Sequence, residues 1–244
     1  MSLAQYLLDI IFPPACLACK KYLKNDLERS RHLCPDCSEK LVFLPGFLCP
    51  VCSRRYPIGG DSPAGECHKD AQFVLAAPLS YGNPVVRELI QALKYGGLKT
   101  AAEPLASVLA EYLRASILNS KFQILDSIII PIPLHPSKEK KRGFNQALVI
   151  AEKLKNSLKI DNPLLTDVLI KVKSTPSQTE KNDYEAREEN VRGSFRVEKP
   201  GLISHKDIFL VDDVFTSGAT MREAARALKS AGAGKIIGLV IARA

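Results

Sequence analysis

The chain has 244 residues, of which 46% are hydrophobic and 25% are charged. This composition is that of an ordinary globular protein, and it excludes a disordered or fibrous chain. No run approaches the roughly 18 apolar residues of a membrane-spanning helix, so we expect no membrane insertion. The formal net charge of +8 favours an anionic partner, either a polyphosphate or a nucleic acid, although a basic surface can also serve solubility alone.

The basic surplus is unevenly distributed along the chain. Residues 1–72 carry nine of the 34 basic side chains and eight of the 26 acidic ones, so nearly all of the surplus belongs to residues 73–244. The first 14 residues are apolar but include Asp9 and lack a basic leader, which indicates an amphipathic helix rather than a signal peptide. We therefore expect a cytoplasmic protein.

All seven cysteines lie between Cys16 and Cys67. Six of them form three Cys-x-x-Cys pairs, and in a cytoplasmic chain such pairs indicate zinc rather than disulfides. Two thiolates three residues apart can face one tetrahedral ion, and a second pair closes the site. The first predicted zinc site consists of Cys16, Cys19, Cys34 and Cys37.

The cysteine region is an internal repeat. The last three cysteines each follow a cysteine of the first site by 33 positions, and Asp70 follows Cys37 by the same offset. The region therefore predicts two tandem zinc ribbons. The second site would consist of Cys49, Cys52, Cys67 and Asp70. His68 competes with Asp70 for the fourth position, and a degenerate ribbon that has lost its metal is the alternative.

The remainder of the chain, residues 73–244, forms a second predicted domain beside the zinc-ribbon module of residues 1–72. Apolar runs bounded by turn residues predict strands over 71–82 (or the start of a hairpin), 126–131, 164–172, 207–211 and 235–242. Helical periodicity predicts helices over 85–95, 101–118, 145–157 and from Ser217 to about Gly232. This alternation indicates an α/β domain with a parallel sheet, whose ligands bind beyond the carboxyl ends of the strands.

Two segments between these elements have no core pattern. The proline-rich stretch 131–136 predicts an irregular loop at the end of a strand, and a basic run from Lys138 to Arg142 follows it. Residues 173–193 are polar and highly charged, which predicts a mobile loop long enough to act as a lid.

The segment Ile208–Thr220 is the most informative part of the sequence. A buried strand leads into two adjacent carboxylates, Asp212 and Asp213, and a small, hydroxyl-rich stretch then opens a helix. Helix N-terminal amides and nearby hydroxyls bind phosphate, and Gly218 would allow close approach. The residues of this predicted cradle are Thr216, Ser217, Gly218, Ala219 and Thr220. The carboxylates would repel a phosphate, so they suit a neighbouring polyol; their alternative role is to cap the turn.

This stretch closely resembles the phosphoribosyl pyrophosphate (PRPP) signature of type I phosphoribosyltransferases. The resemblance implies that Asp212 and Asp213 hold the ribose hydroxyls, that Thr216–Thr220 cradles the 5′-phosphate, and that Mg²⁺ arrives mainly with the pyrophosphate. It also implies the type I phosphoribosyltransferase fold, in which helices flank a parallel sheet.

Several further motifs resemble the ComF family, over nearly the whole chain. Besides the cysteine repeat, they are Leu93-Lys94-Tyr95, Pro131–His135, Arg142–Gln146, Thr175-x-x-Gln178 and Arg187-x-x-Asn190 with Gly193 and Phe195. The resemblance implies that the Leu134–His135 turn is the pyrophosphate loop and that 173–190 is the flexible hood. ComF proteins are associated with the handling of transforming DNA, so single-stranded DNA and DNA-uptake proteins are implied partners.

The chain departs from the family pattern at a few positions. Lys171 and Lys173 stand where arginines are expected before the hood, and lysine loses bidentate phosphate geometry. Lys181 replaces an expected leucine, and Asp70 replaces the eighth cysteine.

A transferase of this kind would displace pyrophosphate at ribose C1 while the protein positions the reactants and neutralises the leaving group. The candidate pyrophosphate-binding residues are Leu134, His135, Lys138, Arg142 and Lys173. The basic stretch from Lys138 to Arg142 and His135 could instead be solvated surface. Phe73, Tyr81 and Tyr95 could stack on an acceptor or pack in the core, and no catalytic residue or acceptor follows from the sequence.

Three functional hypotheses remain open at this point: an enzyme, a protein of the same fold that binds single-stranded nucleic acid, and a PRPP sensor without turnover.

Overall fold

The structure is a computed structural model of the chain that describes residues 9, 13–56, 68, 70–117, 127–173 and 190–244. Most of the predicted N-terminal helix, Cys67 and most of the predicted lid therefore lie outside the described residues. No helix in the described part of the chain is long and apolar enough to cross a membrane.

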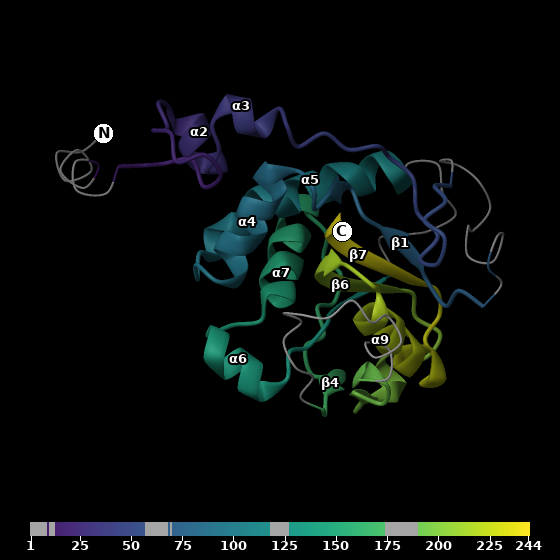
Figure 1. The fold of residues 1–244 in the computed structure, drawn as a ribbon. Helices are drawn as coiled ribbons and strands as arrows, with labels where there is room; N and C mark the ends of the chain where they lie inside the picture. The colour runs from purple at the N-terminus through teal and green to yellow at the C-terminus, as the bar shows by residue number, and fades with distance from the viewer. Residues whose placement is uncertain (1–8, 10–12, 57–67, 69, 118–126, 174–189) are drawn as a thin grey trace.

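A parallel sheet forms the centre of the molecule (Figure 1). Its strands lie in the order β1 (Val74–Ala76), β7 (Ile236–Arg243), β6 (Ile208–Phe215) and β3 (Ile128–Pro131). A short fifth strand, β2 (Leu79–Ser80), also pairs with β7 in parallel. The predicted parallel sheet is confirmed, and the segment 71–82 forms parallel strands rather than a hairpin.

The central strands are buried because helices cover both faces of the sheet. The residues of β3 are all buried, as are the first four of β6. Such continuous apolar runs are typical of a parallel sheet with two covered faces. β6 continues beyond the predicted end at Val211, because Asp212 pairs with Val240 and Phe215 with Arg243 in the ladder to β7.

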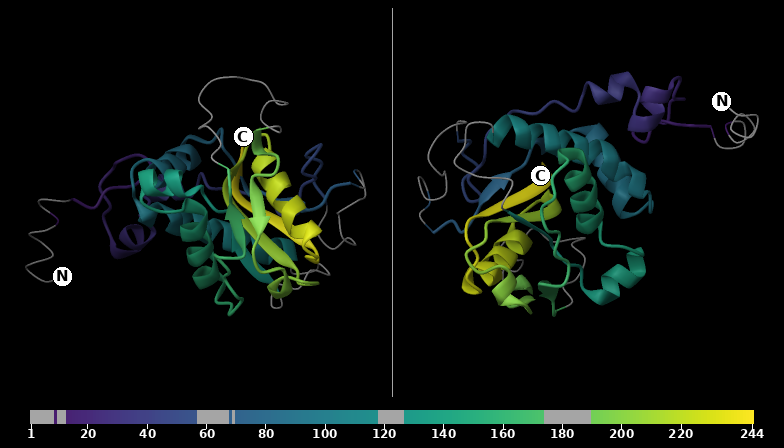
Figure 2. Two further views of the ribbon diagram at one scale, coloured as in Figure 1. Left: turned by 90° about the horizontal axis from the view of Figure 1, so that it is seen from below. Right: turned by 180° about the vertical axis from the view of Figure 1, so that it is seen from behind.

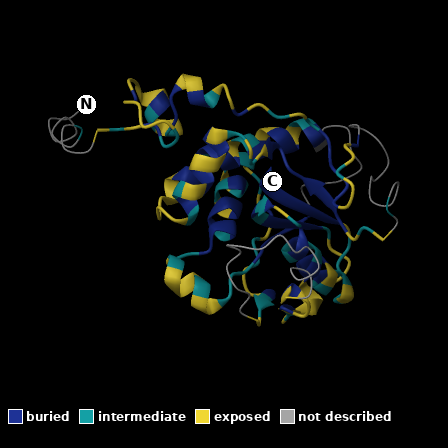
Figure 3. Ribbon diagram, viewed as in Figure 1, coloured by how far each residue is buried: buried dark blue, intermediate teal, exposed yellow. Residues whose placement is uncertain are grey.

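Three helices cover one face of the sheet. They are α4 (Pro84–Lys94), α5 (Ala102–Ile117) and α7 (Gln146–Leu158). Asn83 and Asn145 cap the first and last of these by accepting hydrogen bonds from backbone amides of the first turn. The apolar sides of these helices join β3, β6 and β7 in one core cluster, as the dark blue interior of Figure 3 shows.

The opposite face packs against α9 (Ala219–Ser230) and a small antiparallel sheet. That sheet consists of β4 (Leu169–Lys171) and β5 (Phe195–Val197), which precede and follow the predicted lid segment. The sequence pattern predicted β4 as part of a longer strand and missed β5, whose three residues are too few to show a period.

Residues 132–135 have no regular structure, as predicted, and the basic run that follows them forms a helix, α6 (Pro136–Arg142), that was not predicted. Proline at the first helical position, His135 as the N-cap and Gly143 at φ 87° as the C-cap delimit it. None of its residues is buried, which explains why it lacks a hydrophobic period.

The N-terminal cysteine region contains α2 (Asp26–Arg31) and α3 (Pro35–Ser38), which lie beyond α4 and α5, away from the sheet (Figure 1, Figure 2). Two single-turn helices, η1 (Lys99–Ala101) and η2 (Pro200–Leu202), complete the described elements.

Gly46 holds the segment between the two ribbons against α5. Its amide donates to Ser116 Oγ at 3.0 Å, and its carbonyl accepts from the Tyr112 hydroxyl. Its φ of 98° lies in the left-handed region, and a Cβ there would approach the Tyr56 carbonyl oxygen to 2.5 Å. Only glycine satisfies both constraints.

We therefore expect Gly46→Ala to lower the free energy of unfolding by about 1–3 kcal/mol, from backbone strain and the enforced shift of Tyr56. Thermal denaturation measures the effect. Gly201→Ala is the matched control, because its φ is not in the left-handed region and a Cβ there would meet nothing within 4 Å. Equal melting temperatures for the two variants would contradict the assignment.

Candidate functional site

The first predicted zinc site is assembled in the structure. The ligand atoms of Cys16, Cys19, Cys34 and Cys37 all lie within 4.8 Å of one another. Three of the four are buried, and Cys19 is exposed. Four sulfur donors at this separation fit a structural zinc ion with a closed tetrahedral shell.

The second cluster differs from the predicted set. Cys49, Cys52 and His68 bring their ligand atoms within 4.8 Å of one another, and Cys49 Sγ lies 3.4 Å from His68 Nδ1. Asp70 is exposed and is not part of this group, and Cys67 is outside the described residues. Thiolate and imidazole donors fit zinc as well, so the fourth ligand of the second site stays a prediction.

The 33-residue repeat is also present in the backbone. The amide of Cys16 donates to the Lys21 carbonyl at 2.8 Å, and Cys49 donates to Arg54 at 2.9 Å. Antiparallel bridges join Ala15 to Tyr22 and Leu48 to Arg55. The residues that follow the Cys16–Cys19 and Cys49–Cys52 pairs, Lys20 and Ser53, both have a φ of 65°. The two knuckles therefore share one backbone structure.

The predicted ribose-binding carboxylates lie near the carboxyl end of β6, in the middle of the sheet. Asp213 is only 4% exposed, and its Oδ1 forms an ion pair with Lys94 Nζ at 2.9 Å. Its Oδ2 is buried and has no hydrogen-bond partner among the residues that the structure describes. Asp212 Oδ1 instead accepts from the Asp213 amide at 2.8 Å. Lys94 thus holds Asp213 in place through Oδ1, and Oδ2 stays available as a hydrogen-bond acceptor.

Burial and neighbouring charges both act on Asp212 and Lys94. Burial and the adjacent Asp213 carboxylate raise the pKa of Asp212 to about 7. Burial opposes the charge of Lys94, but its contact with Asp213 and the nearby Asp212 outweigh burial and raise the pKa of Lys94. Asp212 therefore titrates near neutral pH, beside a charged Lys94.

A cation on β4, Lys171, lies near Asp212, and cations on α6 lie near Lys171 in turn. Burial and then Lys138 lower the pKa of Lys171, which also senses the Asp212 carboxylate. Burial and then Arg142 lower the pKa of Lys138. These cations lower one another's pKa values because like charges repel. An anionic ligand would relieve that repulsion, so the cluster is suited to bind one.

The remaining predicted pyrophosphate residues have other contacts. His135 Nδ1 lies 2.8 Å from Ser137 Oγ and caps α6, with Leu134 half-buried before it. Lys173 Nζ is exposed and donates to the Arg192 carbonyl at 3.0 Å. Arg142 covers one face of the Tyr95 ring, with its guanidinium carbon 5.7 Å from the ring centroid.

The predicted phosphate cradle leads from β6 into α9. Gly218 is the N-cap at φ 77°, and Ser217 Oγ accepts from the Ala219 amide at 3.4 Å. A Cβ at Gly218 would lie 2.3 Å from the Phe215 ring and 2.9 Å from Arg222 Nη1. The glycine is thus required by the turn and by packing behind the loop, rather than only by close approach of a ligand.

Comparison with known proteins bears on both halves of the chain. Residues 7–69 match a family model described as a double zinc ribbon domain, and residues 143–244 match a phosphoribosyl transferase domain. Competence protein F of Haemophilus influenzae is 30% identical over 228 residues, which cover 86% of this chain and 96% of that relative. The chain belongs to the ComF family.

Two other ComF relatives align over similar lengths. Competence protein ComFC of Bacillus subtilis is 25% identical over 232 residues, covering 89% of both chains. DNA utilization protein YhgH of Escherichia coli K12 is 25% identical over 209 residues, covering 84% of this chain and 87% of the relative. The zinc-ribbon match and the cysteine cluster together support structural zinc in this ComF chain.

Sequence reasoning missed the role of Lys94 in this ComF site. Lys94 appeared only within a family motif, because no local pattern shows that the end of α4 meets the end of β6.

The three candidate stacking residues differ in their burial. Phe73 is buried, Tyr81 packs against the core, and Tyr95 is 79% exposed.

The raised pKa of Asp212 gives a stability prediction. Between about pH 4 and pH 7 the folded chain binds a proton that the unfolded chain has released, so this group's contribution to stability falls as pH rises through that range. Asp212→Asn mimics the neutral acid. Its melting temperature relative to the parent should therefore be higher at pH 8 than at pH 5.5 by about 3 °C. A difference that does not change with pH would contradict the assignment.

Proposed function

We propose that this ComF chain binds PRPP with Mg²⁺ at the carboxyl ends of β6 and β3 and acts as a phosphoribosyltransferase. In this proposal, Asp212 and Asp213 receive the ribose hydroxyls. The Thr216–Thr220 cradle receives the 5′-phosphate. The cations of α6 and β4 face the pyrophosphate.

One observation carries the proposal: Asp213 is held by Lys94 through one oxygen, while its other, buried oxygen has no hydrogen-bond partner among the described residues. A buried carboxylate oxygen without a hydrogen bond is costly. A ribose hydroxyl would satisfy it as a donor. Asp212, with a pKa near neutrality, could accept from or donate to the second hydroxyl.

Groups on either side of the two acids suit the two ends of PRPP, the 5′-phosphate and the pyrophosphate. The first turn of α9 offers backbone amides that lack intrahelical partners, beside hydroxyl side chains of the cradle. On the other side of the acids, Lys138 and Lys171 form a repelling pair that an anion would stabilise. Mg²⁺ prefers oxygen ligands and binds with substrate phosphates; when bound with pyrophosphate it would neutralise the leaving group.

The chain's own residues would then position C1 of the ribose and stabilise the departing pyrophosphate. Proton transfer has no assigned residue, because the acceptor is unknown. A PRPP sensor without turnover would use the same contacts. Release of pyrophosphate when an acceptor is added distinguishes the enzyme from the sensor.

Calorimetric titration with PRPP and Mg²⁺ tests binding. Asp213→Asn removes the charge that pairs with Lys94 and weakens the acceptor, so we expect the Kd to rise about tenfold or more, the scale of a hydrogen bond to a charged group. Glu111→Gln, an exposed carboxylate on α5, should bind as the parent does. Unchanged affinity in Asp213→Asn would end the assignment.

A second function has its own support. Relatives carry the names competence protein and DNA utilization protein, and α6 exposes basic side chains without burying any residue. We therefore propose, as the alternative, that single-stranded DNA contacts α6 during DNA handling by competent cells, alongside DNA-uptake proteins, and that the Lys140 and Lys141 side chains bind its phosphates.

The salt dependence of binding tests this alternative. For an oligo(dT) probe, Lys140→Gln/Lys141→Gln should reduce the slope of log K against log salt by about 0.7 for each phosphate that the variant no longer binds. Lys206→Gln/Lys235→Gln makes the same charge change on exposed residues just before β6 and β7, at the opposite end of the sheet. Equal slopes for the two double variants would exclude α6 as the DNA-binding element.

A further inference from the structure

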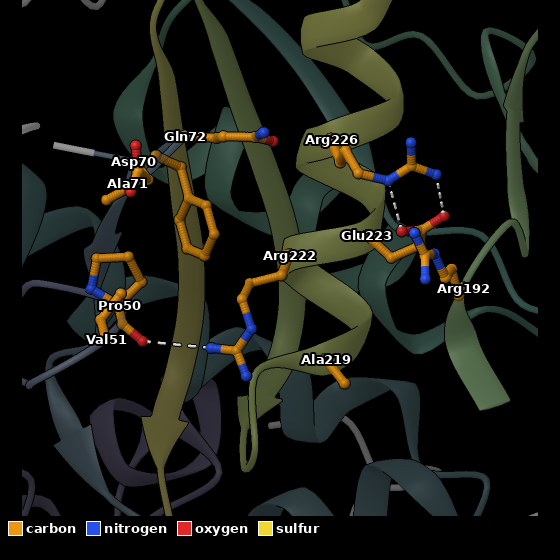
Figure 4. A pocket seen from close by; sticks show the side chains of 11 residues that line it. Pro50, Val51, Asp70, Ala71, Gln72, Arg192, Ala219, Arg222, Glu223 and Arg226 are labelled. Carbon is orange, nitrogen blue, oxygen red and sulfur yellow. Dashed lines mark hydrogen bonds and ion pairs between the residues drawn. The ribbon is translucent and has the colours of Figure 1, made fainter. Parts of the chain in front are cut away.

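Arg222 lies between the second zinc knuckle and the phosphate cradle. It belongs to the first turns of α9, and its guanidinium donates to two backbone carbonyls from distant parts of the chain. Nη2 donates to the Ser217 carbonyl inside the cradle. Nη1 donates to the carbonyl of Pro50, which lies between Cys49 and Cys52, at 3.4 Å (Figure 4).

The space around this link is open. A cavity of about 530 Å³ lies between the knuckle and α9, and Arg222 lines it together with Pro50, Val51 and Ala219. Figure 4 shows the Arg222 side chain crossing from α9 toward Pro50. Because a cavity separates the two elements here, the Arg222 side chain forms a hydrogen-bonded link across it, through which a shift of the knuckle can act on α9.

The base of the knuckle is fixed to the sheet. Leu48, directly before Cys49, exchanges two backbone hydrogen bonds with Leu75 of β1, at 2.8 and 2.9 Å. The conformation of the Cys49–Cys52 turn therefore sets how far the Pro50 carbonyl lies from this fixed base.

That turn depends on its sulfur atoms. The Val51 amide donates to Cys49 Sγ at 3.4 Å, and Ser53 is held at φ 65°, a conformation that costs a residue with a side chain about 1 kcal/mol or more. Zinc bound by Cys49, Cys52 and His68 would hold this strained turn. Loss of the metal would let it relax and move the Pro50 carbonyl, and at 3.4 Å the hydrogen bond from Arg222 is already long.

We propose that Arg222 couples zinc at the second knuckle to anion affinity at the Thr216–Thr220 cradle. With zinc bound, the Pro50 carbonyl orients the guanidinium, and the guanidinium fixes the Ser217 carbonyl and hence the loop. By reciprocity, an anion in the cradle slows the loss of zinc from the knuckle. Arg222 is a positioning residue here, and this inference rests on the proposed PRPP site.

The test measures zinc release from the full-length, zinc-loaded protein into a chromogenic chelator, with and without saturating PRPP and Mg²⁺. A Cys52→Ala variant identifies which kinetic phase belongs to the second knuckle. Saturating ligand should slow that phase about fivefold or more, the lower end of typical coupling between sites, and leave the four-cysteine phase unchanged.

Arg222→Ala and Arg222→Lys should both abolish this protection, since lysine keeps the charge but cannot bridge two carbonyls. Arg226→Ala is the matched control: it removes a guanidinium from the same helix and cavity, but that group pairs with Glu223. Protection in Arg226→Ala should equal that of the parent, and melting temperatures report any general loss of stability.

The outcomes separate the two proposals. Failure of the parent to bind PRPP in calorimetry refutes the proposed function, and the release experiment is then repeated with inorganic phosphate as the probe of the cradle. Binding of either anion without any change in zinc release overturns the coupling. Undiminished protection in Arg222→Ala overturns the role of Arg222.

Discussion

The burial of a charged acid at the end of the central strand constrains the rest of the molecule. An unpaired carboxylate as buried as Asp213 would cost several kcal/mol, so a cation has to reach it. Lys94 does so from the last residue of α4. The length and position of that helix are thus tied to the chemistry of β6, and the same ion pair leaves one acid oxygen available at the carboxyl edge of the sheet.

The helix α9 combines several roles that would otherwise need separate elements. Its N-terminus forms part of the predicted phosphate cradle, and its Arg222 contacts the second knuckle. At the next residue, Glu223 accepts from the Gly193 amide at 2.6 Å, just before β5. A substitution on α9 should therefore affect the cradle, the contact with the second knuckle and the contact with Gly193 together. Matched control variants on the same helix are needed to distinguish these effects.

Much of the fold could be predicted from the sequence, because the strands β3, β6 and β7 are apolar runs and the acids and glycine of Ile208–Thr220 lie within one contiguous segment. The features that were missed arise from tertiary structure. The exposed α6 shows no hydrophobic period, β5 is too short to be detected, and Lys94 meets Asp213 only after folding. The repeat predicted Asp70 as a zinc ligand by its offset, whereas the structure brings His68 to the cluster.

The two zinc knuckles share one backbone structure but differ in their surroundings. Both copies keep the same hydrogen bonds and the same left-handed residue at an offset of 33 positions. One copy lies in an outlying arm, whereas the other is joined to the edge of the sheet through Leu48 and Leu75. A disturbance of the arm therefore stays local, whereas a disturbance of the joined copy is transmitted to the central sheet.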